Sequence, residues 1–185
     1  MQIYKYMNIG TAKPEENEME GIKHHLIDFV NPDEEYNVSK YKEDALDTIK
    51  NIVSKNKVPI IVGGTGLYIN TLVNGIEFSE IEKDERYERE LEEIYKEKGA
   101  DFLFSMLEEV DEEASKVIDK NNIRRVIRAL EIYKVTGKTK TELDRESQKE
   151  PPYDYLVYGI NWDREKLYER INKRVDIMLE AGLVD

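Results

Sequence analysis

The segment at residues 58–69 constrains the fold of this chain more than any other part of the sequence. Residues 58–62 are apolar and rich in valine and isoleucine, which is typical of a buried strand in a parallel sheet. A glycine-rich turn follows at residues 63–66, and an apolar segment that begins at Leu67 has the pattern of a helix. A strand, a turn and a helix in direct succession are a building unit of α/β folds.

The turn at residues 63–66 has the composition of an anion site. Gly63, Gly64 and Gly66 let a ligand approach the backbone closely. The first N–H groups of the following helix lack partners, and the helix dipole attracts negative charge. Thr65 adds a hydroxyl, which either caps the helix or donates to a phosphate oxygen. Spacing alone supports an anion site and a plain capped turn equally.

Composition and charge exclude several classes of protein. The chain has no cysteine, so it forms no disulfide or thiolate metal site, and we expect it in the cytoplasm. It has no apolar run of membrane-spanning length, so we expect no membrane contact. The net charge of -12 argues against non-specific binding to nucleic acid. Residues 116–149 nevertheless carry 10 Lys and Arg against 5 Asp and Glu, which marks a basic surface.

The sequence predicts an α/β chain that is interrupted by helices. Residues 23–30 and 155–160 have the pattern of further strands, whereas residues 84–147 give only helical signals. We therefore expect an incomplete parallel-sheet core at residues 1–76 and 151–185, with an all-helical insertion at residues 77–150. A core of this type has a phosphate-binding loop, G-x-x-x-x-G-K-[ST], after its first strand. The sequence does not contain this loop.

Two groups of arginines lie on predicted helices. Arg124, Arg125 and Arg128 converge on one patch of a helix in the insertion, and we favour nucleic-acid contact over a solvated face. Arg170 and Arg174 are one helical turn apart on the last helix. They either clamp a diphosphate or pair with acidic neighbours, and their spacing alone favours the surface pairs.

Several stretches share their residues and their order along the chain with one enzyme family. These are residues 1–5, 9–14, 25–28, 62–68, 122–131, 136–138 and 163–178. Together they resemble the tRNA dimethylallyltransferases over essentially the whole chain. The resemblance implies transfer of a dimethylallyl group from dimethylallyl diphosphate to N6 of adenosine 37 in tRNA. It also implies a P-loop-NTPase-like core, an insertion that grips the anticodon stem-loop, and Mg²⁺; we expect a monomer.

The resemblance assigns roles to individual residues. Thr65 matches the threonine between the amine and the diphosphate, so the anion at Gly63, Gly64 and Gly66 is expected to be the diphosphate. Met1 and Gln2 match the end of an Asp-Ser-x-Gln segment that meets the target nucleotide. Paired arginines associated with the diphosphate match Arg170 and Arg174, which reverses the preference from spacing. The stretch expected to contact tRNA is Arg124, Arg125, Val126, Ile127 and Arg128.

The match to this family has three departures. The family's P-loop and catalytic aspartate would precede Met1, and its C-terminal core would follow residue 185. We therefore expect an internal fragment that is inactive on its own. Glu88 stands where the family often carries an arginine. Two alternatives stay open: an adenylate isopentenyltransferase that acts on free AMP, ADP or ATP, and a tRNA-binding module without catalysis.

Overall fold

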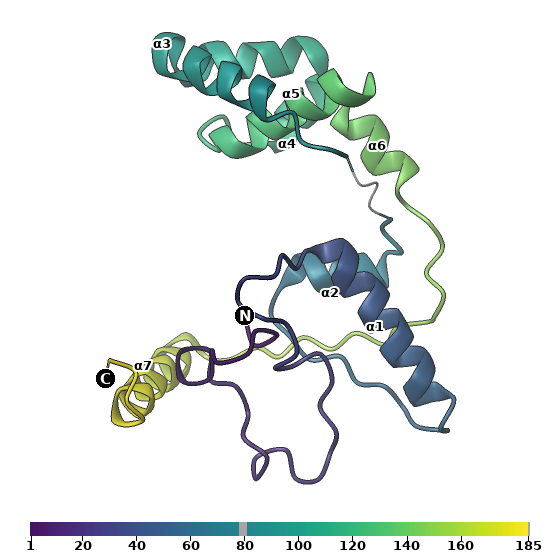
Figure 1. Cartoon of the computed structure of the whole chain (residues 1–185), viewed down its shortest axis with the longest axis vertical. Coiled ribbons are helices and arrows are strands. Elements are labelled where there is room, and N and C mark those ends of the chain that lie inside the picture. The colour runs from purple at the N-terminus through teal and green to yellow at the C-terminus, as the bar shows by residue number, and fades with distance from the viewer. Residues whose placement is uncertain (78–80, 185) are drawn as a thin grey trace. The chain divides into compact units, whose positions relative to one another are not determined.

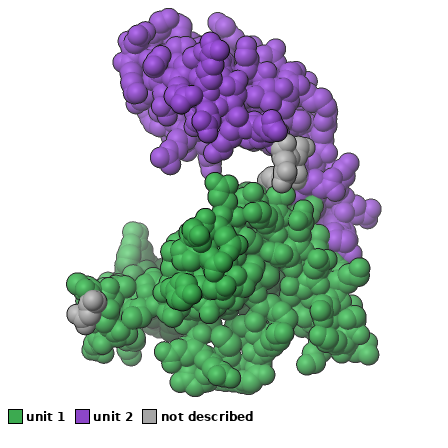
Figure 2. Space-filling view, in the orientation of Figure 1, with its two compact units in different colours: residues 1–73, 153–185 green, residues 74–152 purple. Residues whose placement is uncertain are grey.

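The computed structural model describes residues 1–77 and 81–184. The chain divides into two compact units, drawn in green and purple in Figure 2. The first unit combines Met1–Val73 with Tyr153–Asp185, and the second unit is Asn74–Pro152. The division into two core parts and an insertion at residues 77 and 151 stays a prediction.

The first unit contains the short 3-10 helix η1 (Ile9–Thr11) and the α-helices α1 (Val38–Val53), α2 (Gly66–Val73) and α7 (Arg164–Glu180) (Figure 1). Helix α1 begins where the Asn37 side chain accepts a hydrogen bond from the Lys40 N–H at 3.0 Å. Helices α1 and α2 pack together, and Ile49 of α1 and Leu72 of α2 are buried. The rings of Tyr41 and Tyr68 stack between the two helices with centroids 4.4 Å apart.

The described residues do not confirm the three predicted strands. Residues 58–62 and 155–160 have no regular secondary structure there, and within residues 23–30 only Val30 forms a bridge, with Tyr4. Val58, Ile60 and Val62 are 84%, 82% and 90% exposed. A buried parallel strand requires paired strands on its flanks and cover on both faces. No described segment supplies these, so the apolar pattern is present without its sheet.

The second unit is helical, as the sequence predicts. It contains α3 (Glu85–Val110), α4 (Glu112–Val117), α5 (Ile123–Thr136) and α6 (Lys140–Glu146) (Figure 1). Gly99, with φ of 83° and ψ of 175°, interrupts α3 with a kink between two helical stretches. Helices α3 and α5 pack against each other. The core between the helices of this unit includes Leu91, Leu103, Leu107, Ala114, Val126 and Leu130.

The helix ends of the second unit agree with their sequence signals. Asn122 caps α5, and Thr139 with Glu142 forms a capping box at the start of α6. Gly137 ends α5 in the left-handed conformation. None of the described helices is both long enough and apolar enough to cross a membrane.

Candidate functional site

The turn at residues 63–66 leads directly into α2. The carbonyl of Thr65 accepts hydrogen bonds from the N–H groups of Tyr68 at 3.0 Å and Ile69 at 3.2 Å, so Thr65 lies at the start of the helix. The Thr65 residue is exposed. The turn therefore presents a hydroxyl and the N-terminal end of a helix to solvent.

The glycines of this turn are not explained by packing. A Cβ atom added at Gly63, Gly64 or Gly66 meets no described atom within 4 Å, and none of the three has a positive φ. Neither crowding nor backbone conformation thus requires glycine here among the described residues. Open space at all three glycines is compatible with a ligand that approaches the backbone closely.

Gln2 and Arg174 meet at one backbone carbonyl, although they lie near opposite ends of the chain. The Nε2 atom of Gln2 donates to the carbonyl oxygens of Thr11 at 3.0 Å and Ala12 at 2.9 Å. The Nη2 atom of Arg174 donates to the same Thr11 oxygen at 3.1 Å. The structure therefore brings a residue expected to meet the nucleotide beside a residue expected to bind the diphosphate. Met1 is exposed, and its carbonyl accepts from the Tyr4 N–H at 3.1 Å.

Lys13 lies close to this meeting point and was given no role from the sequence. Its Nζ atom donates to the carbonyl oxygen of Tyr4 at 2.7 Å and to Oδ1 of Asp28 at 2.5 Å. The Lys13 side chain is only 7% exposed. A lysine in a polar loop is normally solvated, so the only sequence signal was its place inside the motif at residues 9–14.

Arg170 and Arg174 do not form the surface ion pairs that their spacing favoured. In the described part of the chain, neither of them pairs with Glu169 or Asp176. The Arg170 guanidinium instead lies over the ring of Trp162, 4.5 Å from its centroid. Stacking leaves the edge of the guanidinium, where its N–H groups lie, available for an anion.

The arginines of α5 divide into two kinds. Arg124 and Arg125 are exposed in the first turn of the helix. Arg128 is bound within the protein, because its Nη1 donates to Oε2 of Glu131 at 2.5 Å and its Nη2 donates to the Ile81 carbonyl at 3.2 Å. Glu131 is 2% exposed and also accepts from the Asp84 N–H at 2.7 Å. Arg128 thus joins α5 to the start of α3.

Val126 and Ile127 belong to the hydrophobic core rather than to a surface. They are 0% and 6% exposed and pack among the helices of the second unit. Their side chains cannot reach RNA while this core is intact. They fix the helix that presents Arg124 and Arg125 to solvent.

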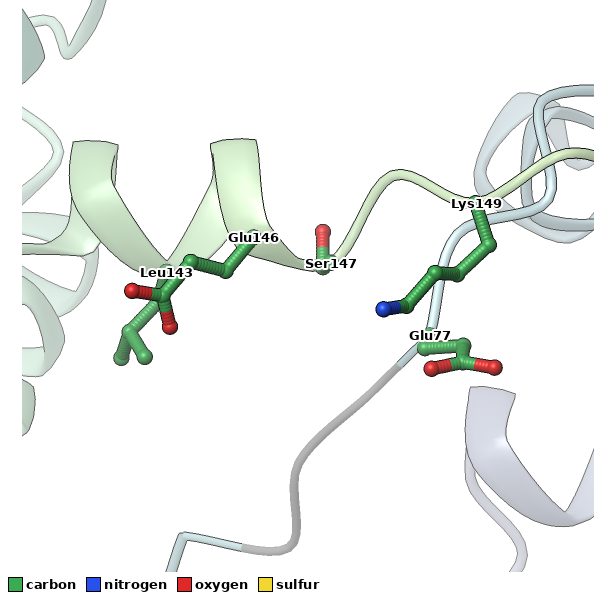
Figure 3. Close-up of a pocket in the computed structure, with 5 residues that line it drawn as sticks. All are labelled: Glu77, Leu143, Glu146, Ser147 and Lys149. Carbon is green, nitrogen blue, oxygen red and sulfur yellow. The ribbon is translucent and has the colours of Figure 1, made fainter.

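Among the hollows on the surface of the described residues, two border helices of the second unit. One, of about 510 Å³, borders the start of α5 and includes Arg124 in its lining. The other, of about 380 Å³, has three charged residues, Glu77, Glu146 and Lys149, in its lining (Figure 3). None of the residues predicted for the site lines the second hollow, so this hollow is not part of the candidate site.

Metal binding has no support from side-chain geometry in the described ranges. No group of three or more His, Cys, Asp or Glu side chains is placed there to hold a metal ion. The described residues therefore offer no all-protein cage for the Mg²⁺ that the family resemblance implies. Burial raises the pKa values of Tyr41 and Tyr68, which lie near the turn at residues 63–66.

Comparison with known proteins gives a consistent result. Residues 2–185 match the model of a protein family described as IPP transferase. Over its whole length the chain is 55% identical to a tRNA dimethylallyltransferase from Acetivibrio thermocellus and 48% identical to one from Finegoldia magna. It covers 59% of each of these proteins. The chain therefore spans about three fifths of the length of these curated relatives.

Solved structures show the same likeness. The full-length tRNA isopentenylpyrophosphate transferase from Bacillus halodurans has a TM-score of 0.61 and 41% identity, over 100% of this chain and 56% of that protein. A eukaryotic dimethylallyltransferase acting on tRNA has a TM-score of 0.78 and 34% identity, over 98% of this chain and 45% of the other. The first of these likenesses covers the whole chain and so includes the turn at residues 63–66 and helix α5.

Proposed function

Because this chain belongs to the IPP transferase family, we propose that it forms the acceptor-binding and diphosphate-binding part of a tRNA dimethylallyltransferase. In the proposed reaction, the dimethylallyl group of dimethylallyl diphosphate moves to N6 of adenosine 37 in tRNA. The observation that carries this proposal is the match over the whole chain with two proteins of that name. A P-loop-type parallel sheet belongs to the same proposal.

We assign the diphosphate to the turn at residues 63–66. The start of α2 offers N–H groups to an anion, and the exposed Thr65 hydroxyl donates to one of its oxygens. Arg170 and Arg174 add positive charge and charge-assisted hydrogen bonds. These donors stabilise the charge that develops on the diphosphate as it leaves.

The acceptor amine reacts at the carbon bonded to the diphosphate. A new N–C bond forms as the C–O bond breaks, the diphosphate takes the electron pair, and the nitrogen releases one proton to a general base. We assign that base to none of the described residues. Gln2 accepts a hydrogen bond from the amine, because its amide nitrogen already donates to Thr11 and Ala12. The adenosine leaves its base stack to reach this position.

We assign the RNA contact to the exposed arginines of α5. Arg124 and Arg125 lie together in its first turn and suit the phosphates of an anticodon stem-loop. Their neighbour Arg128 is already bound to Glu131. The proposed protein acts as a monomer in the cytoplasm, and a chain without cysteine is compatible with that compartment.

The test uses a chimera together with the chain itself. Residues 1–185 replace the aligned part of the Acetivibrio thermocellus relative, and transfer of labelled dimethylallyl is measured with an anticodon stem-loop or AMP as acceptor. We expect transfer to the stem-loop. Transfer only to AMP would instead support the free-nucleotide alternative.

The 185-residue chain provides the binding arm of the same test. Fluorescence anisotropy with a labelled stem-loop should show weaker binding after Arg124→Ala and Arg125→Ala. Lys96→Ala removes an exposed cation from α3 of the same unit and serves as the control. Stem-loop binding by the chain, combined with a chimera that transfers to no acceptor, would favour a binding module without catalysis.

A further inference from the structure

Lys13 joins three separate segments of the first unit. Its ammonium group donates to the Tyr4 carbonyl and to the Asp28 carboxylate, at 2.7 Å and 2.5 Å. The backbone N–H of Asp28 in turn donates to the carbonyl of Gln2 at 3.0 Å. A nearly buried ammonium with two such acceptors holds these segments at fixed separations.

The backbone around Lys13 adopts conformations that need such support. Ala12, the residue before it, has φ of 46°, and its partner Asp28 has φ of 57°. Residues other than glycine rarely occupy this left-handed region, and they persist there where the surroundings over-determine the conformation. Gln2 supplies a second tie, because it donates to the carbonyl of Ala12.

This arrangement fixes which end of the Gln2 amide faces a ligand. The partners of Gln2 are two carbonyl oxygens, which only accept, so the nitrogen end must face Thr11 and Ala12. The Oε1 end then faces away from them as an acceptor. Arg174 donates to the same Thr11 oxygen, so its position depends on the same loop.

We propose that Lys13 is a positioning residue that holds Gln2 and Arg174 in their working geometry through its bonds to Tyr4 and Asp28. Lys13 contacts neither reactant itself. The inference rests on the proposed function for its catalytic consequence, whereas the fixed orientation of Gln2 is a property of the chain alone.

The first experiment measures Gln2 directly in the 185-residue chain. Gln2 and Gln148 are the two glutamines of the sequence, so ¹⁵N-glutamine labelling gives two side-chain amide signals, and Gln148 in the second unit is an internal control. In Lys13→Met, the side-chain amide signals of Gln2 should move to the chemical shifts of a free amide, and the amide hydrogens should exchange with water as fast as those of a free amide. Lys13→Arg should retain the bound signal, and so should the control Lys23→Met, which changes an exposed lysine.

A second, milder variant tests the same contact in case Lys13→Met impairs folding. Asp28→Asn weakens the same tie at a carboxylate that is 56% exposed, and it should shift the Gln2 signal partly in the same direction. An unchanged Gln2 signal in both Lys13→Met and Asp28→Asn would overturn the proposal. So would a change that appears equally at Gln148.

The second experiment is a double-mutant cycle on kcat/KM in the chimera. Gln2→Leu alone should lower kcat/KM about tenfold or more. The same substitution in the Lys13→Met background should lower kcat/KM by less than about threefold, because Gln2 is already misplaced there. Lys13→Arg should restore most of the activity. The control cycle of Lys13→Met with Arg124→Ala should be additive.

Additive losses for Lys13 and Gln2 would overturn the positioning role while leaving the proposed function intact. A chimera without any transfer would count against the proposed function instead. In that case the amide signal of Gln2 still decides whether Lys13 orients it.

Discussion

Arg128 is expected to stabilise the second unit rather than to bind RNA, and Arg128→Ala tests this directly. Removing the guanidinium leaves Glu131, which is 2% exposed, with the Asp84 N–H as its remaining described partner. It also removes the bond to the Ile81 carbonyl. The substitution therefore leaves a buried carboxylate without its cation.

The magnitude follows from how deeply each partner is buried. Breaking a fully buried ion pair by removing one partner costs about 3–5 kcal/mol, whereas an exposed pair contributes about 0–1 kcal/mol. The side chain of Arg128 is 37% exposed and that of Glu131 is 3% exposed. Solvent at the arginine screens part of the loss, so we expect Arg128→Ala to lower the free energy of unfolding by about 1–3 kcal/mol.

The assay is urea unfolding of the 185-residue chain, followed by far-UV circular dichroism, with stem-loop affinity measured in parallel at several salt concentrations. Arg124→Ala makes the same charge change at an exposed position and should alter unfolding by less than about 0.5 kcal/mol. It should also reduce the slope of log affinity against log salt concentration by the amount expected for about one lost phosphate contact. Arg128→Ala with unchanged stability and an RNA defect equal to that of Arg124→Ala would refute this reasoning.

Three further predictions concern other parts of the chain. Asp111→Ala removes the cap of α4 and the partner of Thr141, and should cost about 2–4 kcal/mol in unfolding experiments. Burial raises the pKa of Asp111, but hydrogen bonds from Ala114 and Thr141 outweigh the effect of burial, so the folded-state pKa lies below 3.8. The stabilisation that ionised Asp111 provides should therefore be complete above the unfolded-state pKa of 3.8 and should be lost as pH falls through the lower folded-state pKa. Gly75→Ala places a Cβ 2.1 Å from the Lys149 carbonyl oxygen at a φ of +61°, and should lower the melting temperature through strain of about 1–3 kcal/mol. Thr65→Ala should reduce turnover of the chimera by about 10²–10³, the loss expected for one oriented donor, and an unchanged rate would remove Thr65 from the site.

Local signals in the sequence predict the helices well. Asn122, Thr139 and Asp163 are residue types that favour helix N-caps. They cap α5, α6 and α7, because capping depends on residues only two or three positions away. Strand formation depends instead on partners elsewhere. The valines and isoleucines of residues 58–62 have the strand pattern, yet no described segment pairs with them.

The contacts of the candidate site could not be predicted from the sequence. Gln2 and Arg174 were identified separately, and their shared carbonyl at Thr11 is a tertiary contact that no local pattern contains. Arg128 resembles its neighbours in sequence, and only the burial of Glu131 distinguishes its role. Lys13 was missed because lysine is rarely buried, and its acceptors come from segments distant in the sequence.

The most direct test of the central claim is the identity of the acceptor used by the chimera that carries residues 1–185. We expect labelled dimethylallyl on N6 of adenosine 37 in an anticodon stem-loop, and no product with a stem-loop that has guanosine at that position. Transfer to AMP without transfer to the stem-loop, or equal labelling of the two stem-loops, would contradict it.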